Sequence, residues 1–526
     1  MSQFQSPGRS AVYAQNGMAA TSHPLGARVA VEMLEAGGNA VDAALAGAVL
    51  LGICEPQMTG LGGDLFAIVK PAGSEDLVGL NASGRAPAGL DAAALRARGL
   101  SAMPDATGDS VVVPGAVAGI AHLAERHGRK GLDAVLAPAI RYAEQGVPVA
   151  PRVALDWAEA AERLQGAGRR HFLAGERALP VGAVFRAPGQ AEVLRRIAAE
   201  GPRGFYEGEV AEDMIAALRA AGGSHTAADF AACRADEVTP VSAPYRGAEV
   251  VELPPNSHGA TALLMLRMLE RFGVETHPFG AERAHLEMEI AKLGYAARNQ
   301  MISDPATMTM SVEEFIAEAT AADLAGRISR ERAGPMPVDP LGSPHRDTIY
   351  ITVVDRDGMA VSLIYSIFAN FGSGIASERF GILFNNRAAG FALAEGHPNE
   401  AGGGKRPLHT IIPGMIREGG RVTVPFGVMG GPYQAAGHVR FVSNLVDYGM
   451  DLQAAIDAPR VFFEGDALKL EAGYGADVAA ALEAKGHGII RPQAGIGGAQ
   501  AIRIDHARGV LIGASDPRKD GIALGC

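Results

Sequence analysis

A proline-rich stretch followed at once by a strand-forming stretch divides this chain about two-thirds of the way along. Residues 333–347, AGPMPVDPLGSPHRD, contain four prolines and no periodic pattern, which is typical of a loop. From Thr348 the sequence reads TIYITVVD, then a DRDG turn, then MAVSLIYSI, with β-branched and aromatic residues throughout. This order predicts an antiparallel β-hairpin whose first strand begins at Thr348.

The segments on either side of this loop differ in the secondary structure that they are predicted to form. Helix-forming segments dominate between about residues 110 and 235, whereas the part after Thr348 is predicted to contain further strands at 381–386, 421–431, 501–505 and 509–515, with a helix at 477–486. Helices first and strands later are compatible with layered sheets to which both halves contribute. The pattern therefore favours an α+β fold over two separate domains.

The N-terminal part contains one helix that we expect to be buried. Asn39 can cap an alanine-rich segment that is apolar on most sides, so this segment is predicted to lie between layers. A glycine loop, TGLGGD at 59–64, then leads into LFAIVK at 65–70, which is predicted to be a strand.

Composition narrows the class of protein. Of 526 residues, 48% are hydrophobic and 20% are charged, which is typical of a globular protein, and the net charge is −11. No basic run stands out, so a nucleic-acid partner is not expected. The longest apolar run, at 43–54, is too short to span a bilayer, so no membrane association is expected. Three scattered cysteines and an N-terminus without an apolar core favour a cytoplasmic protein.

Several common site motifs are absent. GGGKRP at 402–407 lacks the first glycine of a phosphate-binding loop, because Asn399 stands there, and Arg406-Pro407 replaces the magnesium-binding hydroxyl. TGLGGD lacks the third glycine of a dinucleotide loop and precedes a strand rather than a helix. The histidines show no zinc-type spacing, and no GxSxG sequence occurs. We therefore expect neither a metal nor a cofactor.

Many short motifs in one fixed order resemble the γ-glutamyltransferase family of N-terminal-nucleophile hydrolases. The matching motifs run nearly the whole length of the chain: GMAATSHPLGARVAVEMLEAGGNAVDAA, GLGGD, GPRGFYEG, PYRGAEVVELPPNSHGA, TIYITVVDRDGMAVS, FGSGI, GILFNN, GKRPLHTIIP, MGG, DYGMDLQAAIDAPR and GASDPR. The resemblance implies a four-layer αββα sandwich of two stacked, mainly antiparallel sheets flanked by helices. It also implies self-cleavage between Asp347 and Thr348. The products 1–347 and 348–526 would stay together as one composite domain.

The resemblance makes Thr348 the catalytic nucleophile. A threonine hydroxyl needs a base, and the cut creates an α-amine on the same residue, with a pKa of about 7.7–8 in model peptides. The family pattern also assigns Gly430 and Gly431 to an oxyanion hole. Ser366 occupies the place of a family threonine that hydrogen-bonds the nucleophile.

The substrate pocket departs from that of the glutathione-processing members. Their carboxylate-binding arginine aligns with Ser83, with Arg85 two residues further on, and a pocket asparagine aligns with Phe368. The other aligned pocket positions are Arg387 and Gly390, which replace a glutamine and the ammonium-binding aspartate, and His409 and Thr410, which replace two serines. The following loop, 392–404, is shorter than the usual lid, so hydrolysis is expected to outweigh acyl transfer.

These changes remove the counter-charge for an α-ammonium and introduce an arginine, whose planar fork suits a carboxylate. They look more like the branch that contains oxamate amidohydrolase. Other interpretations remain: Arg387 pairs with an acid such as Glu378 and supports the pocket wall, His409 is a satisfied core histidine, or Arg85 is simply solvated.

Three functions remain open from the sequence. A γ-glutamyl amide such as glutathione is the family default, and a small carboxylated amide without an ammonium, of the oxamate or glutaryl type, is the alternative. A catalytically silent scaffold is the third. The partner expected in the first two cases is a small amide that carries a carboxylate, and a homo-oligomer of processed heterodimers is possible.

Overall fold

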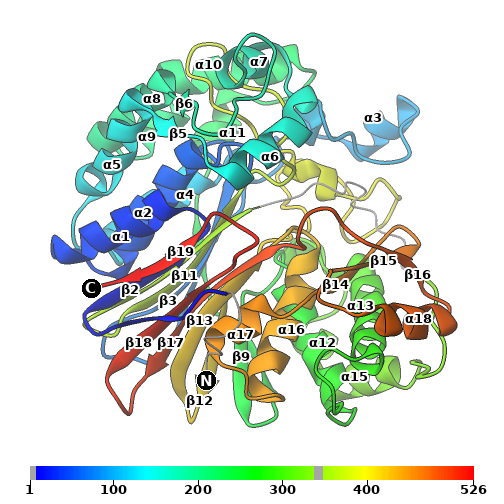
Figure 1. Ribbon diagram of the computed structural model, residues 1–526. Helices are drawn as coiled ribbons and strands as arrows, with labels where there is room; N and C mark the ends of the chain where they lie inside the picture. The colour runs from blue at the N-terminus through cyan, green and yellow to red at the C-terminus, as the bar shows by residue number, and fades with distance from the viewer. Residues whose placement is uncertain (1–7, 337–347) are drawn as a thin grey trace.

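Two seven-stranded sheets form the centre of the molecule (Figure 1). The computed structural model describes residues 8–336 and 348–526. One sheet has the strand order β1 (Val12–Ala14), β18 (Val510–Ser515), β17 (Gly498–Asp505), β13 (Arg421–Met429), β12 (Gly414–Glu418), β9 (Ala248–Glu252) and β8 (Val241–Tyr245). The other, which contains the predicted hairpin, has the order β19 (Ile522–Gly525), β2 (Gly17–Thr21), β10 (Ile349–Asp355), β11 (Ala360–Ser366), β3 (Asp64–Lys70), β4 (Val78–Ala82) and β7 (Asp236–Val238).

Every neighbouring pair in the two large sheets is antiparallel. Each large sheet contains strands from before and from after Thr348; in the hairpin sheet, for example, β10 and β11 lie between β2 and β3. Two smaller sheets contain β14 (Val461–Glu464), β15 (Ala467–Leu470) and β16 (Gly488–Ile490), and β5 (Val147–Pro148) with β6 (Val184–Phe185).

Helices cover the outer face of each sheet and complete four layers (Figure 1). The helices that share a core with the hairpin sheet are α1 (Pro24–Glu35), α2 (Ala40–Cys54), α4 (Ala116–Arg126), α5 (Leu132–Gln145), α6 (Pro151–Ala160), α7 (Gly166–Phe172), α8 (Pro188–Glu200), α9 (Arg203–Tyr206), α10 (Gly208–Ala220) and α11 (Ala227–Ala231). Those on the other side are α12 (Gly259–Glu270), α13 (Ala281–Met301), α14 (Val312–Phe315), α15 (Glu318–Ala325), α16 (Tyr433–Val446), α17 (Leu452–Asp457) and α18 (Ala476–Ala484). Helix α3 (Ala92–Ala97) packs in a smaller cluster with residues of the 388–401 segment.

The two sheets pack face to face through a separate apolar core. Phe66 and Tyr350 from the hairpin sheet meet Met415 and Ile502 from the other sheet in this core. Tyr350 lies so close to Gly427 that a Cβ there would stand 2.3 Å from the tyrosine ring, so the glycine is required for the sheets to approach. This arrangement confirms the predicted αββα sandwich.

The predicted buried helix is α2. All of its residues are buried, and Asn39 and Asp42 form a capping box at its N-terminus. Its apolar residues pack against the hairpin sheet as predicted, because a helix that is apolar on all sides is stable only when it is covered on all sides.

The predicted strand at 381–386 was wrong. These residues form only isolated bridges, such as Gly62 with Phe384. The amide of Asn385 instead donates to Gly62 O at 2.8 Å and Val112 O at 3.1 Å, which fixes the segment across the ends of other strands. Side-chain bonding to the backbone replaces ladder pairing here.

No helix within residues 8–336 or 348–526 combines the length and the apolarity that a membrane span requires.

Candidate active site

The register of the hairpin sheet places three polar residues at the ends of neighbouring strands. Ile349 pairs with Tyr365, so Thr348, just before β10, lies beside Ser366 at the end of β11. The Thr348 hydroxyl donates to Ser366 Oγ at 3.2 Å. On the other side of β11, Ser366 pairs with Asp64, the first residue of β3. All three side chains are buried, so the candidate nucleophile lies two strands away from a buried carboxylate.

Ser366 also holds the backbone that follows it. Its hydroxyl accepts a hydrogen bond from the N–H of Phe368 at 2.9 Å. Phe368 has a φ of 80°, in the left-handed region that is unfavourable for a residue with a side chain. A backbone conformation of this kind costs on the order of 1–3 kcal/mol, and it persists only where the surrounding contacts impose it.

The NNR sequence at 385–387 places Arg387 beside this turn. Asn386 accepts from Ala369 N at 3.0 Å, and Arg387 N donates to Asn385 at 3.0 Å. The Arg387 guanidinium is fully buried, lies 4.1 Å from the centroid of the Phe368 ring and donates to Thr410 Oγ1 at 3.2 Å. Arg387, Phe368 and Thr410 therefore converge near Ser366, as the sequence suggested.

Within residues 8–336 and 348–526, Asp64 is an acid that pairs with Arg387. Its Oδ2 lies 3.4 Å from Arg387 Nε and 3.0 Å from His409 Nε2, and its Oδ1 accepts from Gly84 N at 2.7 Å. The suggested pairing of Arg387 with Glu378 was wrong, because Glu378 forms an ion pair with Arg170.

The protonation of Asp64 follows from these contacts. Burial acts to raise the pKa of Asp64, but the hydrogen bond from His409 and the charge of Arg387 outweigh it, so the pKa lies below its ordinary value. Asp64 is therefore an anion, opposite the Arg387 cation. The sequence did not single out Asp64 as a site residue; the only signal was its place as the last residue of GLGGD.

His409 is neutral and has a fixed tautomer. Its Nδ1 accepts from Ile411 N at 3.3 Å, so Nε2 carries the proton and donates to Asp64. Burial and the nearby Arg387 lower the pKa of His409 to about 3. The ring is fully buried and packs on Phe66. It thus has the contacts of a satisfied core histidine, and at the same time it belongs to the cluster around Arg387.

The glycine pair lies where strand β13 leads into α16. Gly430 has a φ of 123° and Gly431 a φ of 55°, and a Cβ on Gly430 would stand 2.9 Å from the Cα of Gly497. Because Tyr350 of β10 packs on Gly427, the end of β13 extends toward the end of the sandwich where β10 begins. This backbone requires glycine at position 430.

Three predicted pocket residues have other surroundings. Ser83 is buried and accepts from Asn256 Nδ2 at 3.2 Å. The Arg85 side chain is half exposed and pairs with Asp304 at 3.4 Å, so it is neither simply solvated nor part of the cluster around Arg387. Gly390 accepts through its carbonyl from Asn399 at 2.6 Å, which closes the short loop that follows. Asp347, the residue before the predicted cleavage site, lies outside the described residues.

One group of residues in the described parts of the chain has metal-ligand chemistry. His285, Glu289 and His487 place their ligand atoms within 4.8 Å of one another. However, His285 Nδ1 already bonds to His487 Nε2 at 2.8 Å, and Lys292 donates to Glu289 at 2.6 Å. The lysine brings a positive charge to the carboxylate that an ion would need, so the residues form a self-contained network rather than a fitted metal site.

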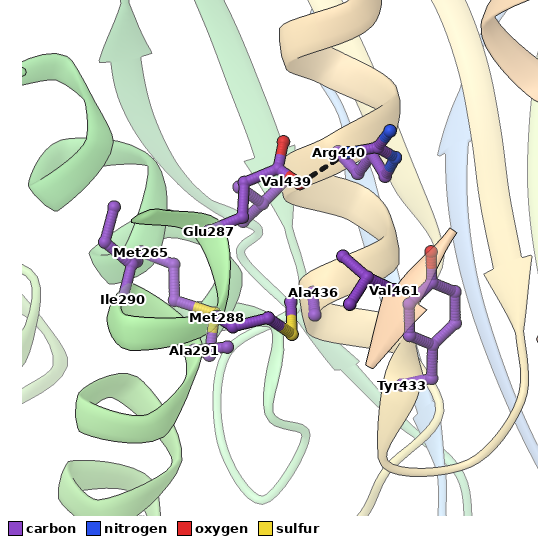
Figure 2. A pocket seen from close by; sticks show the side chains of 10 residues that line it. All are labelled: Met265, Glu287, Met288, Ile290, Ala291, Tyr433, Ala436, Val439, Arg440 and Val461. Carbon is purple, nitrogen blue, oxygen red and sulfur yellow. Dashed lines mark hydrogen bonds and ion pairs between the residues drawn. The ribbon is translucent and has the colours of Figure 1, made fainter. Parts of the chain in front are cut away.

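A small cavity lies between α13 and α16 (Figure 2). Its volume is about 10 Å³, roughly the space for one water molecule. Tyr433 and Met288 line it, and Glu287 and Arg440 join across it at 2.5 Å. The cavity is too small for an amide substrate, so it is not a candidate binding site.

Comparisons with known proteins identify the family of the chain. A family model described as Gamma-glutamyltranspeptidase matches residues 26–526. The Glutathione hydrolase-like YwrD proenzyme of Bacillus subtilis (strain 168) is 34% identical over 523 residues, which covers 97% of this chain and 98% of that protein. The Oxamate amidohydrolase proenzyme of Klebsiella pneumoniae is 33% identical over 531 residues, with coverage of 97% and 98%.

A solved structure extends the likeness to three dimensions. Cephalosporin acylase from Bacillus halodurans matches with a TM-score of 0.93 at 38% identity, covering 100% of this chain and 98% of that chain. The names of these relatives differ in the substrate that they give. From the family match, the fold and the buried threonine site together, we conclude that the chain is an amidohydrolase of the gamma-glutamyltranspeptidase family, within the N-terminal-nucleophile hydrolases.

Proposed function

We propose that this enzyme cuts itself before Thr348 and then hydrolyses a small amide that carries a carboxylate but no α-ammonium. The observation that supports the proposal is the position of the buried Arg387–Asp64 pair next to the Thr348–Ser366 hydrogen bond. A cationic fork beside a nucleophilic hydroxyl suits an amide with a nearby carboxylate. We also propose a cytoplasmic location, because the three cysteines are free and a reducing compartment keeps thiols in that state.

In this mechanism Thr348 has two roles. After the cut, its α-amine takes the proton of its own hydroxyl while Oγ1 attacks the amide carbonyl carbon. The amide C–N bond then breaks, the leaving amine departs with that proton, and an ester remains on Thr348. Water then attacks the ester carbonyl while the α-amine takes its proton. The ester bond breaks, Thr348 Oγ1 regains that proton, and the carboxylic acid is released.

The remaining residues support this attack. Ser366 aims the Thr348 hydroxyl through their 3.2 Å hydrogen bond. Gly430 and Gly431 donate backbone N–H groups to the oxyanion, a contribution of roughly 2.7–4 kcal/mol per donor in comparable sites. The Thr348 side chain is only 1% exposed in the continuous chain, so we infer that the cut also opens the site.

The contacts that Asp64 already makes favour substrates without an ammonium. Among the described residues, Asp64 is an acid that faces Arg387, and its two oxygens already accept from Gly84 and His409. An ammonium would have to compete with those contacts. A γ-glutamyl amide, which brings both a carboxylate and an ammonium, is therefore the second candidate.

The first test concerns self-cleavage. Thr348→Ala removes the hydroxyl, so we expect a single chain of 54.3 kDa on denaturing electrophoresis, whereas the wild type gives two bands. Thr348→Ser keeps the hydroxyl and is expected to cut more slowly, because the β-methyl that restricts χ1 is lost. The control Thr352→Ala, in the strand β10 that follows Thr348, should still cut. A Thr348→Ala protein that cuts normally, or an uncut wild type, contradicts the proposal.

The second test concerns pH. His409 has a pKa of about 3, lowered from 6.5, so it stays neutral above about pH 5 and loses no proton there. The α-amine must lose its proton to act as the base, so kcat/KM should rise with pH through roughly 7–8. We expect His409→Gln to leave the pH of half-maximal kcat/KM in place, whatever its rate. A displacement of one pH unit or more would show that His409 supplies the base.

The third test concerns substrate class. In a panel of γ-glutamyl anilide, glutathione, glutaryl amide and oxamate, we expect at least one of the last two to have a kcat/KM at least tenfold above glutathione. Arg387→Gln should lower that value by roughly 10- to 100-fold, since a hydrogen bond to a charged group contributes about 1.5–3 kcal/mol. Arg170→Gln, which removes an exposed arginine, is the matched control. Preference for glutathione supports the second candidate instead.

A further inference from the structure

Asp64 is a buried carboxylate that takes part in no proton transfer or bond change of the proposed mechanism. We propose that Asp64 is the positioning residue of the acid-binding site: it fixes the Arg387 guanidinium for the substrate carboxylate. This inference rests on the proposed function of the Thr348 site. Three independent elements converge on its two oxygens, namely the turn after β4 through Gly84, the 387–390 turn through Arg387 and the segment before β12 through His409.

The contacts restrain the guanidinium on three sides. Asp64 faces its Nε edge, Thr410 accepts from Nη1, and the Phe368 ring covers one face. A planar fork held in this way can meet a carboxylate in one orientation, which limits the entropy lost on binding. Asp64 is the only one of the three that also carries a charge.

The charge makes Asp64 more than a steric support. A buried cation without a counter-charge is costly to desolvate, and the neutral His409 cannot supply one. With Asp64 present, the Asp64–Arg387 pair carries no net charge before substrate arrives. Without it, the Arg387 side chain would be driven toward another acceptor or toward water, and the fork would leave its binding orientation.

His409 links this pair to the backbone. Its Nδ1 accepts from Ile411 N, so Nε2–H points at Asp64 and fills one lone pair of Oδ2. The carboxylate therefore cannot rotate toward a substrate ammonium without losing a donor. The geometry assigns Asp64 to orienting Arg387 rather than to contacting substrate.

The chain contains a matched control for this role. Glu252 is a fully buried carboxylate that bonds to His438 at 2.6 Å, as Asp64 does to His409, but its described contacts do not include Arg387. Glu252→Gln therefore reproduces the loss of a buried acid beside a histidine without touching the acid-binding site.

The experiment measures carboxylate binding and turnover separately. Cleaved wild type, Asp64→Asn and Glu252→Gln are titrated calorimetrically with oxalate, with glutarate and with uncharged oxamide. We expect the wild type to bind at least one dicarboxylate, Asp64→Asn to bind it at least tenfold more weakly, and Glu252→Gln to match the wild type. For a carboxylated amide that the wild type turns over, Asp64→Asn should raise KM by a larger factor than it lowers kcat.

A double variant tests whether Asp64 acts through Arg387. In an Arg387→Met background, which removes the buried cation, Asp64→Asn should cause no further loss of dicarboxylate binding. This variant also removes the unpaired charge that could prevent Asp64→Asn from folding. The inference is overturned if the wild type binds neither dicarboxylate, or if Asp64→Asn binds as tightly as the wild type does. It is also overturned if Asp64→Asn weakens binding equally in both backgrounds, or if Glu252→Gln weakens binding as much as Asp64→Asn does. Wild-type binding without turnover of any panel amide would instead overturn the proposed function alone.

Discussion

The position of strand β11 between β10 and β3 is the constraint on which the site depends. Its register with β10 brings Ser366 beside Thr348, and its register with β3 brings Ser366 opposite Asp64. A shift by one residue would turn every side chain of the strand to the other face. The pairing is fixed by burial on both faces, since all residues of β10 and β11 are buried. The apolar core thus sets the distance between nucleophile and acid-binding cluster.

The electrostatics of the cluster follow from its burial. A carboxylate and a guanidinium are retained together in the interior because each neutralises the other, and His409 adds a hydrogen bond without adding a charge. Removing Asp64 or Arg387 alone leaves the other as an unpaired charge in the protein interior, which solvates ions poorly. The fold therefore bears on specificity. The proposed acid-binding site already contains its own ion pair, so a substrate that brings a single negative charge meets a cation whose orientation is set.

The sequence predicted most of the fold, whereas the candidate site residues came from the family resemblance and stay predictions. Local signals were sufficient for the hairpin at Thr348 and the buried helix α2, because each depends on the pattern of neighbouring residues. The roles of Gly430 and Gly431 came from the family resemblance instead. The strand expected at 381–386 failed because asparagine side chains compete with ladder pairing there.

The acid partner of Arg387 could not be found in the same way. Asp64 lies more than 300 residues earlier in the chain, and no spacing rule connects them. Only the three-dimensional pairing of β3 with β11 shows that the last residue of a glycine loop faces the pocket. Glu378 was a reasonable guess by proximity in sequence, but it lies on the surface, where Arg170 pairs with it.

The most direct measurement of the central claim is mass spectrometry of enzyme quenched with acid during turnover of a slow carboxylated amide, followed by peptide mapping. If Thr348 is the acyl-accepting nucleophile of a processed chain, the peptide that begins at Thr348 carries the mass of the substrate acyl group as an ester. Turnover with the acyl group on another residue, or with that segment still joined to Asp347 in the active protein, would contradict the account.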